Sequence, residues 1–507
     1  MTEQGIATDE RRCGVCFAVG ERELKTIIRV TTASLMALAG MMPAGADGTN
    51  KTPPLTLEPC FIDGVKERIS CASVMLPLDY SNPGGESIPV HVAVIPAKSA
   101  APAADPFLVF AGGPGQAAGE FGFLIEAAFD DIRSDRDILL IDQRGTGKSH
   151  GLRCSFEGLE DSAQDFRLVA EECRAEFTID VRHFTLENII RDTDEIRELL
   201  GYQQLNLWGG SYGTKSISLY LKRYPERVRS IIVDGILPPD QSLFLSAPAS
   251  AERALGKLVE DCKTQPACNT AFPNFREQVD TLVEQAANGE LRYEGIDPVS
   301  GKYIELDIGF EMAVESIRSV MYSAEGTTLL PYVVNEATGG NLTPMLASLM
   351  NSSAVSDSMY LGATMSLLCG EDVASIDAEA AAKAGEGSFA RDSYYRIWSG
   401  HCSGWDYVRP AAADFFAPIN SNVPALMLSG DLDPVTPPSL GDHWAKGFPN
   451  GRHITVKGTG HITSHAACMP KLLSEFIDHL DPALLDTGCL DHLNRLPIVV
   501  GVNGNVQ

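Results

Sequence analysis

The sequence has no excess of positive charge, no apolar run long enough to cross a bilayer, no internal repeat and no low-complexity tract. Asp and Glu number 67 against 40 Lys and Arg, and the formal net charge of -27 disfavours binding to nucleic acid or to anionic membrane surfaces. The absence of repeats excludes solenoids and other repeat arrays. The sequence has 507 residues, of which 44% are hydrophobic. This length and composition suffice for one large core and a sizeable insertion.

The first 46 residues have the pattern of a targeting leader. Lys25 and Arg29 supply positive charge, Val30–Met42 is a short apolar run, and Ala44–Ala46 fits an A-x-A cleavage signal. The run is shorter than the roughly 20 apolar residues that span a bilayer. We therefore expect residues 1–46 to be removed, and the protein to be exported to the periplasm or secreted without stable membrane association.

The cysteines indicate an oxidising compartment. Cys13 and Cys16 lie in the leader, and the other ten are an even number spread as close neighbours. No CxxC pair or Cys–His cluster outside the leader has the ligand spacing of zinc, and we expect neither metal nor cofactor. Proximity along the chain predicts five disulfides: Cys60–Cys71, Cys154–Cys173, Cys262–Cys268, Cys369–Cys402 and Cys468–Cys489.

Eight apolar runs bounded by turn residues predict the strands of one sheet. They are Val74–Tyr80, Ile88–Ala97, Phe107–Gly112, Asp137–Asp142, Leu205–Gly210, Val228–Asp234, Pro424–Gly430 and Arg452–Lys457. The first two suit a hairpin, whereas the later runs alternate with helical patterns, which predicts parallel strands with crossover helices. Continuous apolar runs are typical of strands buried on both faces. The sequence therefore predicts an α/β fold with an eight-stranded, mostly parallel sheet.

The strand series is interrupted after its sixth run. Residues 241–412 are mostly helical in pattern, and the series resumes at residue 424. An insertion at this point predicts a helical cap over the carboxyl ends of the strands, where open α/β sheets bind ligands. The core then consists of residues 47–240 and 413–507. An independent second domain is the alternative to the cap.

A candidate nucleophile lies directly after the fifth run. Gly209-Gly210-Ser211-Tyr212-Gly213 is a G-x-S-x-G motif, preceded by a predicted strand and followed by a helical pattern. The glycines permit a sharp strand-to-helix turn that presents the hydroxyl of Ser211. The alternative is a glycine-rich turn with a surface serine.

A serine nucleophile needs a base that is held by a third group, and in this fold the chain order is Ser, acid, His. Asp433 follows a predicted strand and precedes Pro434, which favours an extended or turn conformation there. His461 lies in a glycine-bracketed loop after the last predicted strand. Asp431 is the second candidate for the acid, and His465 for the base.

Acyl transfer also requires donors for the developing oxyanion. The glycine-rich stretch Ala111–Gly115 follows a predicted strand, and we expect the amides of Gly113 and Tyr212 to be these donors. The stretch Asp142–Ser149 is similar to a phosphate-binding loop, but Asp142 stands where that motif needs Gly. We expect it to brace the loops around the site.

Five motifs, taken in order, resemble the proline iminopeptidase and tripeptidyl aminopeptidase branch of the α/β-hydrolases. They are Gly112–Gly115, Asp142–Ser149, Gly209–Gly213, Gly430–Pro434 and Gly458–His461. The resemblance runs from about Cys60 to the C-terminus, and from about Asp414 it is to the C-terminal domain of tripeptidyl-aminopeptidase-like proteins. It implies an α/β-hydrolase fold and an exopeptidase that releases residues or short peptides from free N-termini. Ala111 replaces the His of iminopeptidases, which favours the tripeptidyl-aminopeptidase-like branch.

The resemblance also implies a site for the substrate's α-ammonium group. Cys369-Gly370-Glu371-Asp372 resembles the family's Cys-x-Glu-Asp stretch, which makes Glu371 the first candidate and Asp372 the second. The alternative is a solvated acidic turn beside a disulfide. Two other functions stay open: an ester hydrolase with the same triad, and a non-catalytic binding protein, which the complete triad disfavours.

Overall fold

The computed structural model describes residues 55–154, 165–298, 300–349, 359–410 and 412–504. They belong to one compact unit, Thr52–Gln507. The predicted leader, with Cys13 and Cys16, lies outside the described residues. Within the described ranges, no helix is both long and apolar enough to cross a membrane.

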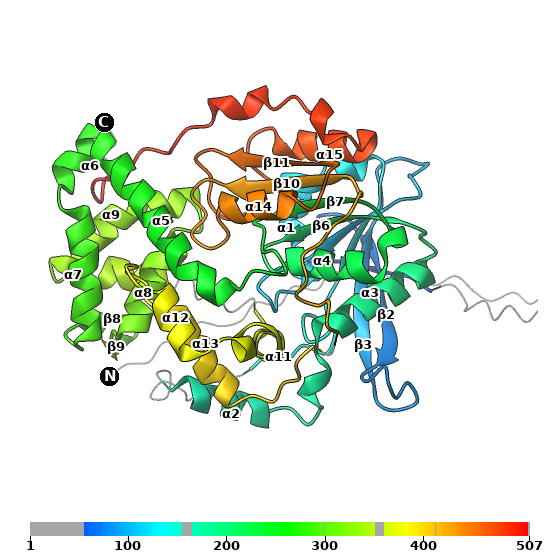
Figure 1. Ribbon diagram of the computed structural model, residues 1–507, viewed down its shortest axis with the longest axis horizontal. Coiled ribbons are helices and arrows are strands. Elements are labelled where there is room, and N and C mark those ends of the chain that lie inside the picture. Colours follow the sequence, from blue (N-terminus) through cyan, green and yellow to red (C-terminus); the bar gives the residue numbers. More distant parts are fainter. Residues whose placement is uncertain (1–54, 155–164, 299, 350–358, 411, 505–507) are drawn as a thin grey trace, which may run out of the picture. The chain divides into compact units, whose positions relative to one another are not determined.

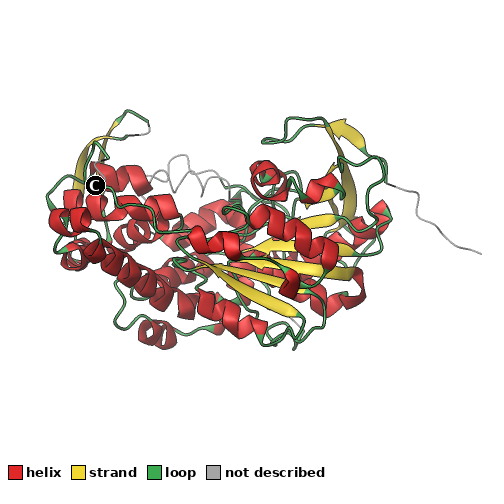
Figure 2. Ribbon diagram, turned by 90° about the horizontal axis from the view of Figure 1, so that it is seen from above, coloured by secondary structure: helices red, strands yellow, loops and turns green. Residues whose placement is uncertain are grey.

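A nine-stranded sheet forms the centre of this unit, with helices packed against both of its faces (Figure 1, Figure 2). Its strands are β1 (Glu58–Cys60), β2 (Ile69–Pro77), β3 (Ser87–Ile95), β4 (Phe107–Phe110), β5 (Ile138–Ile141), β6 (Leu205–Gly210), β7 (Val228–Asp234), β10 (Ala425–Gly430) and β11 (Gly451–Val456). The order across the sheet is β1-β2-β3-β5-β4-β6-β7-β10-β11. Pairing is antiparallel from β1 to β5 and parallel from β5 to β11. The predicted α/β-hydrolase fold with a mostly parallel sheet is thus confirmed.

The prediction of eight strands was one short. The additional strand, β1, has three residues and pairs with the edge strand β2, to which the Cys60–Cys71 disulfide also joins it. Such a short segment has no periodicity of its own, and only its neighbour makes it a strand. As a consequence, the insertion follows the seventh strand and not the sixth.

Alternate residues of the central strands face opposite layers of the core. Leu207 of β6 packs in one apolar cluster with residues of α3 (Leu186–Leu200) and α4 (Gly213–Arg223). Its neighbour Trp208 packs in a second cluster with residues of α15 (Met469–His479). Strands β4, β5, β6 and β10 are buried along their whole length, as continuous apolar runs require.

The segment between β7 and β10 is mainly helical, as predicted, and gathers beside the sheet (Figure 1, green to yellow). It contains α5 (Leu243–Thr264), α6 (Pro266–Ala271), α7 (Phe275–Ala287), α8 (Phe310–Val320), α9 (Ala324–Thr338), α11 (Leu361–Glu371), α12 (Ala378–Ala384) and α13 (Ser393–Ser403). It also contains an unpredicted two-stranded sheet, β8 (Arg292–Ile296) with β9 (Tyr303–Asp307). These strands are largely exposed, so they lack the apolar runs by which the other strands are found.

The insertion packs in two ways. Its first part has an apolar cluster of its own, which includes Leu255, Val279 and Leu330. Residues of α11 and α13, such as Leu368 and Trp398, instead join the cluster that packs against the sheet. The inserted segment is therefore joined to the core through its later helices.

All five predicted disulfides are present in the structure, with Cα–Cα distances from 5.1 to 6.4 Å. Cys369–Cys402 joins α11 to α13, and Cys262–Cys268 joins α5 to α6. Proximity along the chain therefore predicted the correct partners.

Candidate active site

Ser211 occupies the turn between β6 and α4, as the motif predicts. Its φ is 56°, a left-handed conformation that is strained for a serine. A Cβ at Gly209 would lie 2.5 Å from the carbonyl oxygen of Gly213, and one at Gly213 would lie 2.3 Å from that of Phe110. Larger residues cannot replace these glycines without a shift of the backbone. The turn therefore has the strand–turn–helix geometry expected of a nucleophile elbow.

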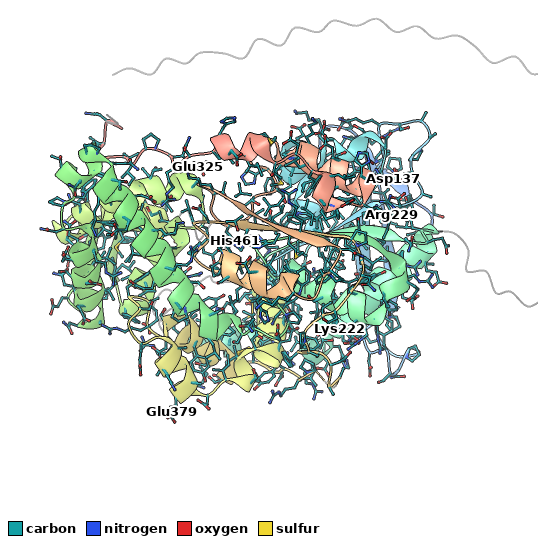
Figure 3. The ribbon with its side chains drawn as sticks, turned by 45° about the horizontal axis from the view of Figure 1, so that its top comes forward. Asp137, Lys222, Arg229, Glu325, Glu379 and His461 are labelled. Atoms are coloured by element: carbon teal, nitrogen blue, oxygen red, sulfur yellow. A yellow bond between two sulfur atoms is a disulfide. The ribbon has the colours of Figure 1, made fainter. Side chains whose placement is uncertain are left out.

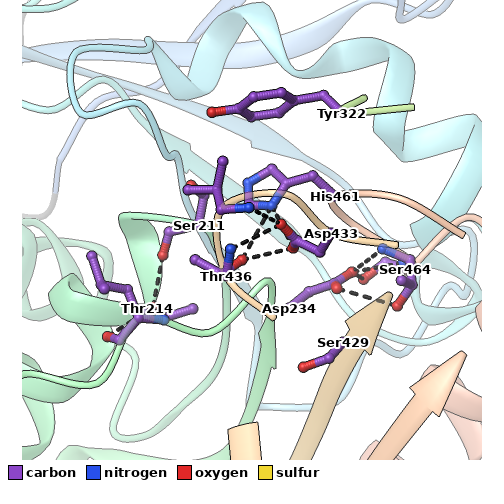
Figure 4. A network of polar contacts seen from close by, with 12 residues as sticks. Ser211, Thr214, Asp234, Tyr322, Ser429, Asp433, Thr436, His461 and Ser464 are labelled. Carbon is purple, nitrogen blue, oxygen red and sulfur yellow. Dashed lines mark hydrogen bonds and ion pairs between the residues drawn. The ribbon is translucent and has the colours of Figure 1, made fainter. Parts of the chain in front are cut away.

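Asp433 and His461 are hydrogen-bonded to each other. The Nδ1 atom of His461 lies 2.7 Å from Oδ2 of Asp433 (Figure 4). The carboxylate is fully buried, and it also accepts hydrogen bonds from the amides of Val435 and Thr436, each at 2.8 Å, and from the Thr436 hydroxyl at 2.7 Å. The carboxylate of Asp433 thus accepts four hydrogen bonds, which orient it toward the imidazole.

This arrangement shifts the pKa values of both partners. Burial opposes the charge of Asp433, but His461 and the Thr436 donors outweigh it and hold the pKa of the carboxyl below its usual range. Burial likewise opposes protonation of His461, but the carboxylate of Asp433 raises the pKa of the imidazole above its usual value. Both shifts favour the ion pair that forms when the imidazole accepts a proton.

The second candidate for the acid has a different role. Asp431 accepts the amide hydrogen of Gly458 at 2.7 Å through Oδ1, and its Oδ2 lies 2.9 Å from Nζ of Lys257. It therefore joins the acid loop to the start of the histidine loop, and Asp433 alone of the two carboxylates contacts His461.

Ser211 and His461 meet at the end of β7. The amide of Ser211 donates to the carbonyl oxygen of Asp234 at 2.8 Å, and a Cβ at Gly235 would lie 2.8 Å from Cε1 of His461. The side chain of Ser211 lies beside the imidazole ring in Figure 4. Three strands, β6, β10 and β11, thus deliver the serine, the aspartate and the histidine to one edge of the sheet.

The predicted oxyanion donors lie next to Ser211. A Cβ at Gly112 would lie 3.2 Å from Cβ of Ser211, which places the Ala111–Gly115 loop against the serine. In the described part of the chain, the amides of Gly113 and Tyr212 have no hydrogen-bond acceptor. Both amides are thus available to a substrate oxygen, as an oxyanion donor has to be.

The inserted segment covers the histidine. The amide of His461 donates to the carbonyl oxygen of Tyr322 at 2.7 Å, and the two rings meet edge to face at 5.2 Å (Figure 4). The hydroxyl of Tyr322 accepts a hydrogen bond from Arg318 at 2.6 Å. His461 consequently lies between the C-terminal strands and the inserted helices (Figure 3). Tyr322 belongs to no motif, and nothing in the sequence singles it out.

Glu371 and Asp372 lie behind the elbow and not on the surface. They are 4% and 3% exposed, so the alternative of a solvated acidic turn is wrong. Asp372 accepts from Nζ of Lys215 at 2.8 and 2.9 Å, and Glu371 accepts from the hydroxyl of Tyr212 at 2.6 Å. Burial, opposed by Lys215 and Tyr212, raises the pKa of Glu371 to about 7.

Glu371 also lines a cavity of about 440 Å³. The described residues around this cavity come from segments 180–188, 366–371 and 408–415, and not from the loops of Ser211 or His461. The two carboxylates thus contact Tyr212 and Lys215, which follow Ser211 in the chain, and neither is hydrogen-bonded to Ser211 or His461 in the described residues.

The Asp142–Ser149 stretch braces neighbouring loops, as expected. Asp142 accepts hydrogen bonds from the amides of Gly119 and Lys148, at 2.7 and 2.9 Å. The buried guanidinium of Arg144 pairs with Asp192 at 2.7 Å. Across the described ranges, no group of three or more His, Cys, Asp or Glu side chains could hold a metal ion.

Comparison with known proteins agrees with this geometry. The family model of the alpha/beta hydrolase fold matches residues 105–270, and that of the TAP-like proteins matches residues 389–489. The chain is 28% identical to the tripeptidyl aminopeptidase of Streptomyces lividans over 206 residues, which are 36% of this chain and 38% of the relative. It is 31% identical to carboxylesterase B of Mycobacterium tuberculosis over 223 residues, which are 39% of this chain and 42% of the relative.

The aligned parts are less than half of the length of these relatives. Among solved structures, proline iminopeptidase of Mycobacterium smegmatis is 16% identical, with a TM-score of 0.42 over 81% of this chain and 99% of that one. The chain has an α/β-hydrolase fold with a TAP-like C-terminal region.

Proposed function

We propose that this protein is an exported serine aminopeptidase that works through an acyl-enzyme. The observation that carries the proposal is the strained elbow of Ser211 beside the hydrogen-bonded pair of His461 and Asp433. A binding protein would have no need of a strained serine and a buried acid–base pair at one edge of the sheet.

In the proposed reaction, Oγ of Ser211 attacks the scissile carbonyl carbon, and Nε2 of His461 accepts the hydroxyl proton. Asp433 receives a hydrogen bond from Nδ1, which leaves Nε2 unprotonated and available as the base. The amides of Gly113 and Tyr212 stabilise the oxyanion. His461 then donates its proton to the leaving amine, and a water molecule repeats the sequence to release the acyl product.

A carboxylic ester hydrolase is the second candidate, since peptides and esters pass through the same type of tetrahedral intermediate. The partial similarities to a tripeptidyl aminopeptidase and to a carboxylesterase support one candidate each. We favour peptides because of the resemblance of the ordered motifs and because a large inserted segment adjoins His461. Five disulfides support export. The net charge of -27 disfavours a nucleic acid, so we propose a peptide or small ester as the substrate.

Of the two carboxylates implied to bind the substrate amine, we retain Glu371. Asp372 already has an ammonium partner in Lys215, whereas Oε1 of Glu371 accepts no hydrogen bond from any described residue. A free carboxylate oxygen can accept an ammonium group, and the hydrogen bond from Tyr212, which follows Ser211 in the chain, joins Glu371 to the elbow.

The experiment that tests the proposal uses purified protein without residues 1–46. Its substrates are one peptide with a free N-terminus, the same peptide acetylated, and a short p-nitrophenyl ester, and Ser211→Ala is the control. Of the two peptides we expect cleavage of the free one only, together with turnover of the activated ester, and loss of both activities in the variant. Turnover of the ester with neither peptide cleaved would reject the peptidase and leave the catalytic residues in place.

A further inference from the structure

Asp234, the last residue of β7, contacts both halves of the site. Its carbonyl oxygen accepts the amide hydrogen of Ser211 at 2.8 Å. Oδ2 of its side chain accepts the amides of Thr463 and Ser464, each at 2.7 Å, and the Ser464 hydroxyl at 2.7 Å (Figure 4). Thr463 and Ser464 belong to the histidine loop, where Ile462 alone separates them from His461. One residue thus holds the serine with its main chain and the histidine loop with its side chain.

The carboxylate of Asp234 is fully buried and forms no ion pair with a Lys or Arg side chain of the described residues. Burial raises its pKa, and the donors from Ser464 and Thr463 oppose that shift. Burial of a carboxylate without a cationic partner destabilises the fold, and a neutral polar residue could hold the loop with a smaller desolvation penalty. This cost suggests that the negative charge itself has a use.

The network extends to the strand that carries Ser211. The Nε1 atom of Trp208 in β6 donates to the Ser464 hydroxyl at 2.9 Å, and Ser464 in turn donates to Asp234. Gly235, at a φ of 64°, leaves room for the imidazole of His461 where a Cβ would clash. The position of the histidine relative to the serine is therefore set through the end of β7.

We infer that Asp234 is a positioning residue for the proposed reaction, one that fixes His461 relative to Ser211 and stabilises the imidazolium with a second negative charge. The inference rests on the proposed serine hydrolase. The charged and titratable groups that act on His461 are Asp433 of the acid loop, Asp234 of β7, and Arg318 with Tyr322 of the insertion. Of these, Asp433 and Asp234 favour the protonated imidazole and Arg318 disfavours it.

The test compares Asp234→Asn with Asp234→Ala in the full protein. In the Asn variant the amide oxygen can accept the donors that now reach Oδ2, while the amide nitrogen faces the Thr463 hydroxyl, which can accept. It therefore removes the charge and keeps the contacts. The Ala variant removes both.

Ester hydrolysis measured against pH is the readout, together with labelling of Ser211 by a fluorophosphonate and thermal unfolding. For Asp234→Asn we expect the acid limb of kcat/KM to move to lower pH by roughly one unit, because the imidazolium has lost a nearby negative charge. For Asp234→Ala we expect kcat/KM to fall roughly 100-fold, because the histidine loop loses its anchor.

Asp192→Asn is the matched control, since Asp192 is equally buried but pairs with Arg144 away from the site. It should lower the unfolding temperature and leave the acid limb in place. An Asn variant at position 234 with the parent pH profile and rate would overturn the inference. If the parent protein neither hydrolyses the ester nor labels at Ser211, the proposed function fails instead.

Discussion

Nη2 of Arg253 donates to the carbonyl oxygen of Asp433 at 2.6 Å, so a helix of the insertion holds the residue that orients the histidine. Nη1 of the same side chain donates to the carbonyl of Asp431 at 2.8 Å, and Lys257, one turn further along α5, pairs with the Asp431 carboxylate. Tyr322 makes the corresponding contact to the histidine loop. The insertion therefore contacts both the Asp433 loop and the His461 loop from outside the sheet.

Replacement of Arg253 by Met should lower kcat/KM for an ester substrate roughly tenfold, since loss of two charge-assisted hydrogen bonds of about 1.5 kcal/mol or more each loosens the acid loop. Lys257→Met is the control from the same helix, because its side chain is 41% exposed and, among the described residues, its ammonium group pairs with the Asp431 side chain alone. Lys257→Met should lower kcat/KM less than threefold, because an exposed ion pair contributes roughly 1 kcal/mol or less. Equal effects of the two variants would argue against a role for Arg253 in positioning.

The pH dependence of kcat/KM should report the imidazole of His461. Its pKa is raised above the usual value because the attraction of Asp433 outweighs burial, and the base works only when unprotonated. Activity should thus be lost as the pH falls through a pKa above about 6.5, the ordinary value of histidine. Asp433→Asn should lower kcat by roughly four orders of magnitude, because the wrong tautomer is then favoured. A half-maximal rate well below pH 6 in the parent protein would contradict the assignment of His461.

Lys215→Met should destabilise the fold. Lys215 is 3% exposed, and its ammonium group is the cation beside the two buried carboxylates Asp372 and Glu371. Removal of one partner from a buried ion pair costs about 3–5 kcal/mol, which urea unfolding would measure. Lys471→Met, which removes a surface pair with Glu475, should cost less than about 1 kcal/mol.

Asp372→Asn distinguishes the buried ion pair with Lys215 from binding of the substrate amine. Because Asp372 is already paired with Lys215, the ratio of rates on the free and the acetylated peptide should not change in the variant. Glu371→Gln, in contrast, should lower the rate on the free peptide selectively if Glu371 accepts the amine. A selective loss in the Asp372 variant would show that Lys215 yields its partner to the substrate.

The disulfides should contribute according to the loops that they close. Cys369 and Cys402 are 33 residues apart and Cys262 and Cys268 only 6 apart. The loop-entropy relation gives about 4 kcal/mol for the first and about 2 kcal/mol for the second. Paired serine variants, compared by urea unfolding, should follow this order, and the reverse order would show that native contacts decide the effect.

Local patterns in the sequence determined much of the fold and the central residues of the candidate site. The strands that precede Ser211 and Asp433, β6 and β10, are buried along their whole length, so each is a mainly apolar run, and Ser211, Asp433 and His461 each lie within five residues of the end of a strand. The elbow requires small residues around the serine within five positions. The disulfides join near neighbours in the chain. In each case the physical requirement acts over a short stretch of sequence and leaves a visible pattern there.

Tertiary structure alone decided which groups support these residues. Asp234 bonds to residues 229 and 230 positions away, and Arg253 to a carbonyl 180 positions away. Lys215 meets its carboxylate 157 positions further along the chain. Such contacts depend on how helices and strands pack, and a single Asp, Arg or Lys bears no local mark of its distant partner. The strand β1 and the β8–β9 hairpin were missed for the same reason, because pairing with a neighbour, and not burial of an apolar run, makes them strands.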